Sequence, residues 1–188
     1  MAAKSNLTNM VCCLGAVCLV CAALLGGVYV LTEDAIAQTN AALLRESVGS
    51  VLPAGGTLSE ALPLEVGGTP SEYYVSTADG APAGYAVKST VSGFGGPLVL
   101  MVGLTPEGKV YGTSVLSHAE TPGLGAKCTS DAAFIDQFKG FDPAVSRLAV
   151  RKDGGGDVDA ITASTITSRA YALAIANAVA AFQNIKGE

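Results

Sequence analysis

The feature that most constrains this chain is an apolar run near its N-terminus. No charged residue occurs between Ser5 and Thr32, and residues 10–31 are mostly Val, Leu, Ala, Cys and Gly. At about 1.5 Å per residue, a helix of this length spans a bilayer core of roughly 30 Å. We therefore expect a transmembrane helix over residues 10–31, preceded by a short N-terminal segment over residues 1–9.

The charges beside this run predict its orientation. Lys4 precedes the run, whereas Glu33 and Asp34 follow it. By the positive-inside rule, residues 1–9 are cytoplasmic. The chain is then a single-pass protein of a bacterial inner membrane, and its C-terminal domain faces the periplasm or the exterior. The alternative is a cleaved signal peptide, because residues 35–37 have the small-x-small form. We favour an uncleaved anchor, because the run is longer than a typical signal peptide core.

The rest of the chain has the length and composition of one globular domain. It holds 16 Asp and Glu residues and all but Lys4 of the 11 Lys and Arg residues. This mildly acidic balance includes no basic patch, so nucleic acid is excluded as an expected partner. The hydrophobic share of 49% exceeds what a soluble domain needs, and the excess lies in the apolar run. Membrane lipid is therefore an expected partner.

The cysteines do not predict a metal centre. Four of them lie in the apolar run (Cys12, Cys13, Cys18 and Cys21), and Cys128 lies outside it, so no disulfide is expected within the domain. Cys18 and Cys21 share a helix face. Small residues on one face of a membrane helix usually serve packing, and we interpret these two cysteines in that way. His118 is the only histidine, and no zinc, haem or catalytic-triad pattern includes it. We expect no metal ligands and no catalytic residues.

The coarse pattern beyond the apolar run predicts an α+β fold. A helical stalk and a Gly- and Pro-rich linker are expected over residues 32–70, with the linker at residues 53–70, and the domain over residues 71–188. Its sheet is expected to be mainly antiparallel, because a turn signal at residues 105–108 joins two strand-like runs. The expected strands are 73–76, 84–91, 98–104, 109–117 and 147–151, and the expected helices are 129–138 and 164–182.

The start of the last expected helix is unusually rich in hydroxyl groups. Five Ser and Thr side chains lie between Thr162 and Ser168. An N-cap needs only one of them, which satisfies a free N–H group of the first turn. A helix N-terminus also attracts phosphate through these N–H groups and through its dipole. Composition alone does not decide between a simple N-cap and a phosphate-binding site. Apolar residues at helical spacing follow, and we expect them on the buried face: Ile166, Ala170, Leu173, Val179 and Phe182.

A second unusual segment is the sequence His-Ala-Glu-Thr-Pro-Gly-Leu-Gly over residues 118–125. Its two glycines allow the backbone to approach a ligand closely. Leu124 offers one apolar side chain against which a flat ring could pack. The alternative is a surface loop fixed by Pro122. By contrast, the glycine-rich segment 93–96 lacks the lysine and the following helix of a phosphate loop, so we interpret it as a connection between strands.

Together these two segments resemble the FMN-binding domain of the G subunit of the Rnf complex. The Glu-Thr-Pro-Gly-Leu-Gly loop is followed some forty residues later by Asp159-x-x-Thr162-x-x-Thr165. The same domain occurs in the C subunit of the sodium-translocating NADH:quinone reductase. The resemblance also includes the N-terminal anchor, the strand at Gly84-Tyr85 and the hairpin that contains Gly103 and Gly108.

The resemblance implies that FMN is attached covalently to Thr165 by a separate flavin transferase. It implies an electron-carrying subunit of an ion-translocating ferredoxin:NAD⁺ oxidoreductase, whose other subunits are its partners. We expect no catalytic activity from the chain in isolation. The alternatives are a component of the quinone reductase, a separate membrane-anchored flavoprotein for extracellular electron transfer, and a non-redox binding module. The residues expected around the cofactor, besides Thr165, are Thr162, Ser164, Ile166, Thr167, His118, Glu120, Thr121, Gly123, Leu124 and Gly125, with Tyr85 and Phe94 as weaker candidates.

One part of the hydroxyl-rich segment departs from the family pattern. The usual Gly-Ala before the attachment threonine is Ala163-Ser164 in this chain. Glycine adopts positive φ freely, and we expect that alanine in its place removes access to this conformation. Ser164 adds a hydroxyl group, so Ser164 or Thr167 is a minor alternative for the attachment. The spacing of Asp159, Thr162 and Thr165 still favours Thr165.

Overall fold

The structure is a computed structural model that describes residues 7–187. A long helix, α1 (Leu7–Ser50), is followed by six strands and then by the short elements η1, α2 and η2 and the final helix α3. The chain forms two compact units, one up to Leu43 and one from Leu44. The strands are β1 (Thr57–Leu58), β2 (Leu62–Val66), β3 (Thr69–Ala78), β4 (Ala81–Ser92), β5 (Pro97–Leu104) and β6 (Val110–Ser117), and the later elements are η1 (Gly125–Thr129), α2 (Ala132–Asp136), η2 (Arg151–Asp153) and α3 (Thr165–Gly187).

The first unit consists of the N-terminal part of α1. Among the described residues, α1 is the one helix that is long and apolar enough to cross a membrane. Its leucines and valines up to Leu43 are exposed in the structure. A helix with an apolar surface on all sides is stable in lipid, where the backbone groups satisfy one another. The helix includes residues 10–31, and the membrane span over these residues stays a prediction.

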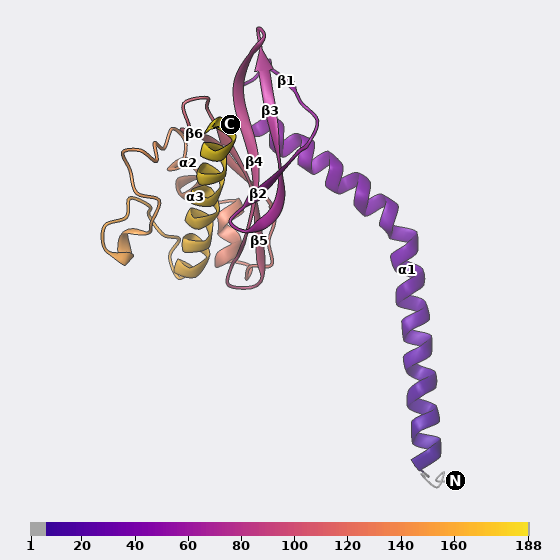
Figure 1. Ribbon diagram of the computed structural model, residues 1–188. Helices are drawn as coiled ribbons and strands as arrows, with labels where there is room; N and C mark the ends of the chain where they lie inside the picture. Colours follow the sequence, from indigo (N-terminus) through magenta and orange to yellow (C-terminus); the bar gives the residue numbers. More distant parts are fainter. Residues whose placement is uncertain (1–6, 188) are drawn as a thin grey trace. The chain divides into compact units, whose positions relative to one another are not determined.

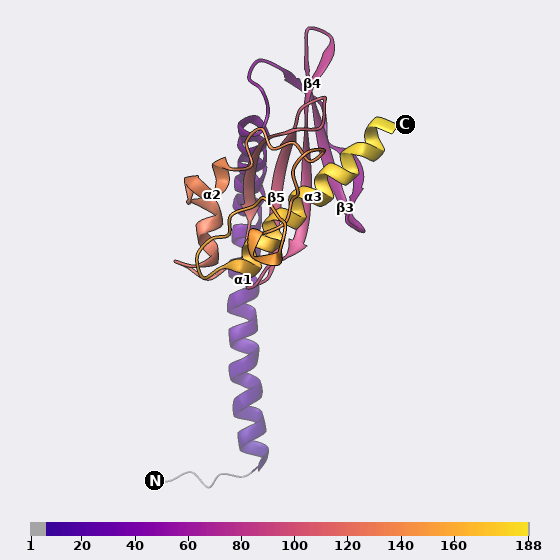
Figure 2. The same cartoon turned by 90° about the vertical axis from the view of Figure 1, so that its left-hand side faces the viewer.

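The second unit contains an antiparallel sheet with the strand order β1-β3-β4-β5-β6, and β2, like β1, pairs with β3. Figures 1 and 2 show α3 lying across this sheet. Side chains alternate between the two faces of a strand. Accordingly, Leu100 and Val102 of β5 belong to the core under α3, whereas Met101 belongs to a second cluster. The α+β fold with a mainly antiparallel sheet and a C-terminal helix is confirmed.

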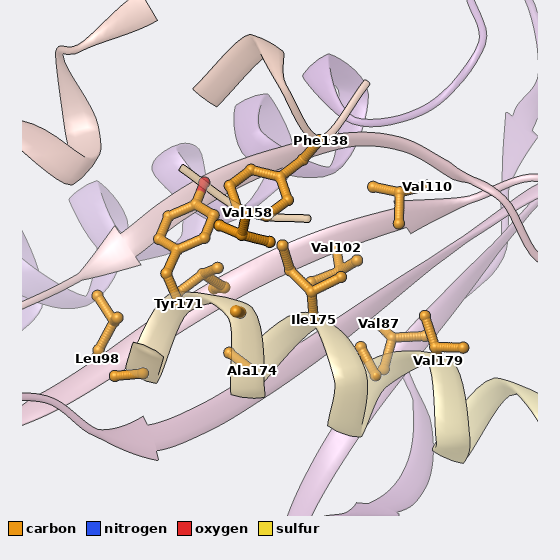
Figure 3. Close-up of a cluster of buried hydrophobic side chains, with 14 of the residues drawn as sticks. Val87, Leu98, Val102, Val110, Phe138, Val158, Tyr171, Ala174, Ile175 and Val179 are labelled. Atoms are coloured by element: carbon orange, nitrogen blue, oxygen red, sulfur yellow. The ribbon is translucent and has the colours of Figure 1, made fainter. Parts of the chain in front are cut away.

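The main core lies between α3 and the sheet. Figure 3 shows Ile175 and Val179 of α3 near the buried strand residues Val102 and Val87, and the Tyr171 ring against Phe138, at 5.1 Å between ring centroids. Alanines occupy the same helix face at Ala170, Ala174 and Ala178, so that α3 lies close to the strands. This packing fixes the first turn of α3 relative to the loops at the end of the sheet.

The opposite face of the sheet is covered by the end of α1. Val48, Val51 and Leu52 are buried there with Ala86 and Met101. The backbone of Val51 lies directly on the sheet at Gly103, where a Cβ atom would overlap the Val51 carbonyl oxygen. Burial of these apolar side chains stabilises the contact by about 25 cal/mol per Å² of apolar surface.

Several predicted elements differ from the structure. The segment 53–70 is not a linker, because it contains β1, β2 and the start of β3. The compact unit begins at Leu44, so a domain start at residue 71 is too late. The strand expected at 147–151 is reduced to one isolated bridge between Val150 and Val158. The helix expected at 129–138 is the shorter α2, preceded by η1.

The predicted buried face of α3 is also partly wrong. Ala170, Val179 and Phe182 are buried, but Ile166 and Leu173 are 50% and 52% exposed. The buried face instead includes Thr167, Ser168 and Tyr171. The cause is that hydroxyl groups with hydrogen-bond partners are buried at the start of the helix, which hydrophobicity alone does not predict.

Candidate functional site

A tight turn positions the first residues of α3. The N–H group of Ser164 donates to the carbonyl oxygen of Ile161 at 3.0 Å, which closes a turn around Thr162 and Ala163. Ala163 has a φ of 62°, although alanine rarely adopts positive φ. The expectation that alanine would deprive this position of the glycine conformation is therefore wrong. The chain adopts this conformation at a cost of about 1–2 kcal/mol.

Two of the five hydroxyl groups in the cluster are used by the fold itself. The Ser168 hydroxyl donates to the carbonyl oxygen of Ser164 at 2.9 Å and accepts from the N–H of Ile161 at 3.0 Å. The Thr167 hydroxyl donates to Oε2 of Glu120 at 2.8 Å. Both side chains are buried. They hold the turn and the loop against α3, so neither is free to react.

The other three hydroxyl groups differ in their surroundings. Thr162 is exposed and lies outside the cavity described below. Ser164 is buried, and its Oγ has no hydrogen-bond partner among the described residues. Thr165 is half-buried and lines the cavity. Thr165 is therefore the residue of the cluster that lines the cavity and is not buried.

The first turn of α3 also has free backbone donors. The first helical hydrogen bond runs from the N–H of Ser168 to Ser164, at 3.0 Å. The N–H groups of Thr165, Ile166 and Thr167 have no acceptor within the described part of the chain. Such groups, together with the helix dipole, form an anion site. An anionic group at Thr165 would thus meet both donors and a favourable field.

The carboxylate of Glu120 joins three segments around this turn. Its Oε1 accepts from the N–H of Phe94 at 2.7 Å and from that of Gly95 at 3.4 Å. Its Oε2 accepts from Thr167. A Cβ on Gly125 would lie 2.5 Å from this Oε2 and 2.7 Å from the Thr167 hydroxyl, so glycine is needed for the close approach. The β4–β5 loop, the 118–125 loop and α3 are held together by these contacts.

These segments enclose a cavity of about 350 Å³, within the usual size range of ligand sites. Its rim has three exposed apolar side chains, one from each segment: Phe94 (66% exposed), Leu124 (45%) and Ile166 (50%). The cavity is lined by Phe94, Glu120, Thr121, Leu124, Gly125, Ala163, Ser164, Thr165, Ile166 and Thr167. Apolar edges beside free backbone donors suit a flat ring that bears an anionic tail.

Most of the residues expected at the site line this cavity, and four do not. Thr162 and Gly123 lie in the adjoining turns, outside the cavity wall. His118 does not line the cavity, and its Nδ1 accepts from the N–H of Glu120 at 3.2 Å. Tyr85 packs against Phe182, at 5.0 Å between ring centroids, and does not line the cavity. Phe94 lines it, and Ala163 does so although the sequence did not single it out as a contact.

Two titratable groups near the site, Cys128 and Tyr171, are buried. Burial and the Glu120 carboxylate raise the pKa of the Cys128 thiol to about 11. Burial raises the pKa of Tyr171 to about 12, against the effect of its 2.7 Å hydrogen bond to Thr113. Both groups are therefore neutral at physiological pH and belong to the core.

Known proteins that are similar to this chain in sequence are G subunits of ion-translocating oxidoreductase complexes. The G subunit of the ion-translocating oxidoreductase complex from Stutzerimonas stutzeri is 35% identical over 175 residues, which are 88% of this chain and 76% of that protein. The chain belongs to the family of G subunits of these complexes. The resemblance inferred from the two motifs is confirmed.

The cavity wall lies inside the segment that matches a known family of cofactor-binding domains. The family model of the FMN-binding domain matches residues 93–180, which include every residue of the cavity wall. The G subunit of the proton-translocating ferredoxin:NAD(+) oxidoreductase complex from Clostridium ljungdahlii is 42% identical over 95 residues. This match spans about half the length of each of the two proteins, since it covers 50% of both.

The fold also occurs in the related quinone reductase. The crystal structure of the C subunit of the Na(+)-translocating NADH-quinone reductase from Parabacteroides distasonis has a TM-score of 0.51 and 26% sequence identity to this chain. The similarity covers 63% of this chain and 64% of that one. Members of the G-subunit family and this quinone reductase protein therefore have a common domain, and this chain contains an FMN-binding domain of that type.

Proposed function

We propose that this chain is an electron-carrying flavoprotein subunit that holds FMN covalently at Thr165. The observation on which this rests most directly is the position of the five hydroxyl groups. The hydroxyl groups of Thr167 and Ser168 are buried and form hydrogen bonds. The Oγ atom of Ser164 is buried, and Thr162 lies outside the cavity. Thr165 remains as the one hydroxyl residue of this cluster that lines the cavity and is not buried.

The surroundings of Thr165 fit a phosphate group. A phosphodiester on its hydroxyl keeps one negative charge at the N-terminus of α3, beside the free N–H groups of Thr165, Ile166 and Thr167. Ser164 adds a buried hydroxyl without a partner. A buried donor without an acceptor costs about 1–3 kcal/mol, and a phosphate oxygen would offset this cost.

The rim of the cavity fits an isoalloxazine ring. Phe94, Leu124 and Ile166 present apolar surface to solvent from three segments. A planar aromatic ring covers such surface and leaves its polar edge for backbone groups. FMN supplies redox chemistry by accepting and releasing electrons, and the protein supplies position and electrostatics. The further contacts expected with the ring and ribityl chain are to Glu120, Thr121 and Gly125.

We further propose that the chain acts within an ion-translocating ferredoxin:NAD⁺ oxidoreductase. Its membership of the G-subunit family and its similarity to the C. ljungdahlii protein support this role. Its partners would be the other subunits of the complex, which would also provide the ferredoxin and NAD sites. The chain alone would transfer electrons without catalysing the overall reaction.

The same proposal includes the membrane arrangement. The apolar helix α1 and the membrane complexes named for the relatives support membrane association. Residues 1–9 would lie in the cytoplasm and the FMN-binding domain outside it, as the charges of Lys4 and Glu33 predict. A covalent bond suits this location, because FMN lost outside the cell membrane is not readily replaced. A flavin transferase would form the bond.

The second candidate is a component of a sodium-translocating quinone reductase. The similar domain of the P. distasonis protein favours it, at 26% identity. Co-purification of the full chain from its native membrane separates the two candidates. Recovery with the subunits of a ferredoxin:NAD⁺ oxidoreductase supports the first, and recovery with those of the quinone reductase supports the second.

Covalent attachment is tested by electrophoresis of the full chain after co-expression with a flavin transferase. The wild type should give a fluorescent band under ultraviolet light in a denaturing gel. Thr165→Val should abolish the band, because valine keeps the shape but lacks the hydroxyl. Thr69→Val, which removes an exposed hydroxyl at the start of β3 outside the cavity wall, should keep it. A fluorescent Thr165→Val band would place the attachment elsewhere.

A further inference from the structure

The cavity wall contains one ionisable side chain that the attachment of FMN does not require. Glu120 is only 5% exposed, and its side chain lines the cavity. None of the ion pairs formed by the described residues includes it. A buried carboxylate without a cationic partner is rare, because desolvation of the charge is costly.

The hydrogen bonds around Glu120 suit its ionised form. The N–H groups of Phe94 and Gly95 and the hydroxyl of Thr167 all donate to its two oxygens. An ionised carboxylate accepts at both oxygens, whereas a protonated one must donate from one of them. Nothing in this set needs a proton from Glu120.

The glycines around the carboxylate leave little space for water. A Cβ on Gly93 would overlap Oε1, and a Cβ on Gly125 would lie 2.5 Å from Oε2. The charge is thus shielded less than a surface charge is, because the effective dielectric of such a site is well below that of water. Its field acts mainly on whatever occupies the cavity.

We propose that Glu120 is an electrostatic tuning residue that lowers the reduction potential of a flavin in this cavity. An electron that enters the ring without a proton adds one negative charge, which the carboxylate repels. The ring is thereby a weaker electron acceptor and, once reduced, a stronger donor. This inference rests on the proposed function, since it requires FMN at Thr165.

The test is the midpoint potential of the full chain in detergent, loaded by co-expression with a flavin transferase. Loading is first measured as the fluorescent band. The flavin absorbance is then titrated with dithionite as reductant and ferricyanide as oxidant, with mediators. Glu120→Gln keeps the size of the side chain and removes its charge. Its amide oxygen can still accept from the N–H groups of Phe94 and Gly95, and its NH2 group donates to the Thr167 hydroxyl, which donates to the carboxylate in the wild type. This variant should favour reduction roughly tenfold, which is about 59 mV for a one-electron couple.

Three further variants separate charge from structure. Glu120→Asp keeps the charge and shortens the side chain, and Thr167→Val removes a donor but leaves the charge in place. Neither should raise the potential. Glu72→Gln removes a carboxylate that pairs with Lys88 at 2.9 Å, outside the cavity wall, and should leave the potential unchanged.

The outcomes distinguish this inference from the proposed function. A wild-type chain without a fluorescent band contradicts the attachment itself. A loaded Glu120→Gln variant with the wild-type potential overturns the tuning role and leaves the attachment intact. An equal rise in Thr167→Val also overturns it, because loosening of the loop would then explain the shift. If Glu120→Gln does not load, a raised potential in Glu120→Asp overturns the inference, and an unraised one supports it.

Discussion

The Thr167 hydroxyl donates a hydrogen bond of 2.8 Å to the Glu120 carboxylate, across 47 residues of sequence. This bond joins the first turn of α3 to the 118–125 loop. Because Glu120 also accepts from the N–H of Phe94 at 2.7 Å, the same carboxylate holds the β4–β5 loop. Two motifs that are far apart in the sequence therefore form one cavity wall, and Thr165 lies beside their junction.

Ala163→Gly should stabilise the domain. Ala163 has a φ of 62°, which glycine adopts without steric cost. We expect the free energy of unfolding to rise by about 1 kcal/mol, and Tm by roughly 3 °C. Thermal unfolding of the full chain in detergent measures this. A fall in Tm would contradict the assignment of strain to this turn.

Gly103→Ala should destabilise the contact between the end of α1 and the sheet. A Cβ at Gly103 would overlap the Val51 carbonyl oxygen, and overpacking against backbone costs about 1–3 kcal/mol or more. Gly112 is its cross-strand partner, where a Cβ would lie at an ordinary 3.7 Å from the Cα of Val51. Gly112→Ala is therefore the matched control and should cost much less in denaturant unfolding. Equal costs would show that the contact at Val51 is unimportant.

Ser164→Ala should have opposite effects on the free and the flavin-loaded chain. The hydroxyls of Ser164 and Ser89 are both buried without partners among the described residues. Without flavin, removal of either should leave stability unchanged or raise it by about 1 kcal/mol. With flavin, Ser164→Ala should lose the bond to the phosphate, whereas Ser89→Ala should behave as before.

These effects are measured as the rise in Tm on loading with flavin, for the wild type and for both variants. A smaller gain in Ser164→Ala alone supports a phosphate contact. The same gain in all three proteins would exclude Ser164 from the phosphate site.

Stability should fall above pH 9. Burial raises the pKa of Cys128 from 9.0 to about 11, so the folded state keeps a proton that the unfolded state releases. The stabilisation is complete below pH 9 and is lost as the pH rises through about 11. Thermal unfolding between pH 8 and pH 11 should show a smaller fall in Tm for Cys128→Ala than for the wild type. A fall of the same size in both would assign the effect to other groups, such as Tyr171.

The local pattern of the sequence predicts the strands of the sheet well. Residues 98–104 and 109–117 match β5 and β6 closely, because the apolar run and the turn at residues 105–108 are local signals. The pattern misses β1 and β2 within residues 53–70. These strands are short or at the sheet edge, and pairing with β3 determines them rather than their own composition.

The sequence predicts which residues form the site better than it predicts what each of them does there. The motifs identify Thr165, Glu120 and Leu124, which the cavity brings together. They do not distinguish the exposed Thr162 from the buried Thr167, since burial of a hydroxyl depends on a partner far away in the sequence. Ile166 was expected both on the buried helix face and beside the cofactor. It lies on the cavity rim and not in the core, because Thr167 and Ser168 occupy the buried face.

The most direct test of the account is the intact mass of the full chain, purified from membranes after co-expression with a flavin transferase. We predict one covalent adduct with the mass of FMN less one water. Fragmentation should locate it on Thr165, and Thr165→Val should have the unmodified mass. An unmodified wild-type chain, or an adduct on Thr162, Ser164 or Thr167, would contradict the assignment of Thr165 as the flavin attachment site.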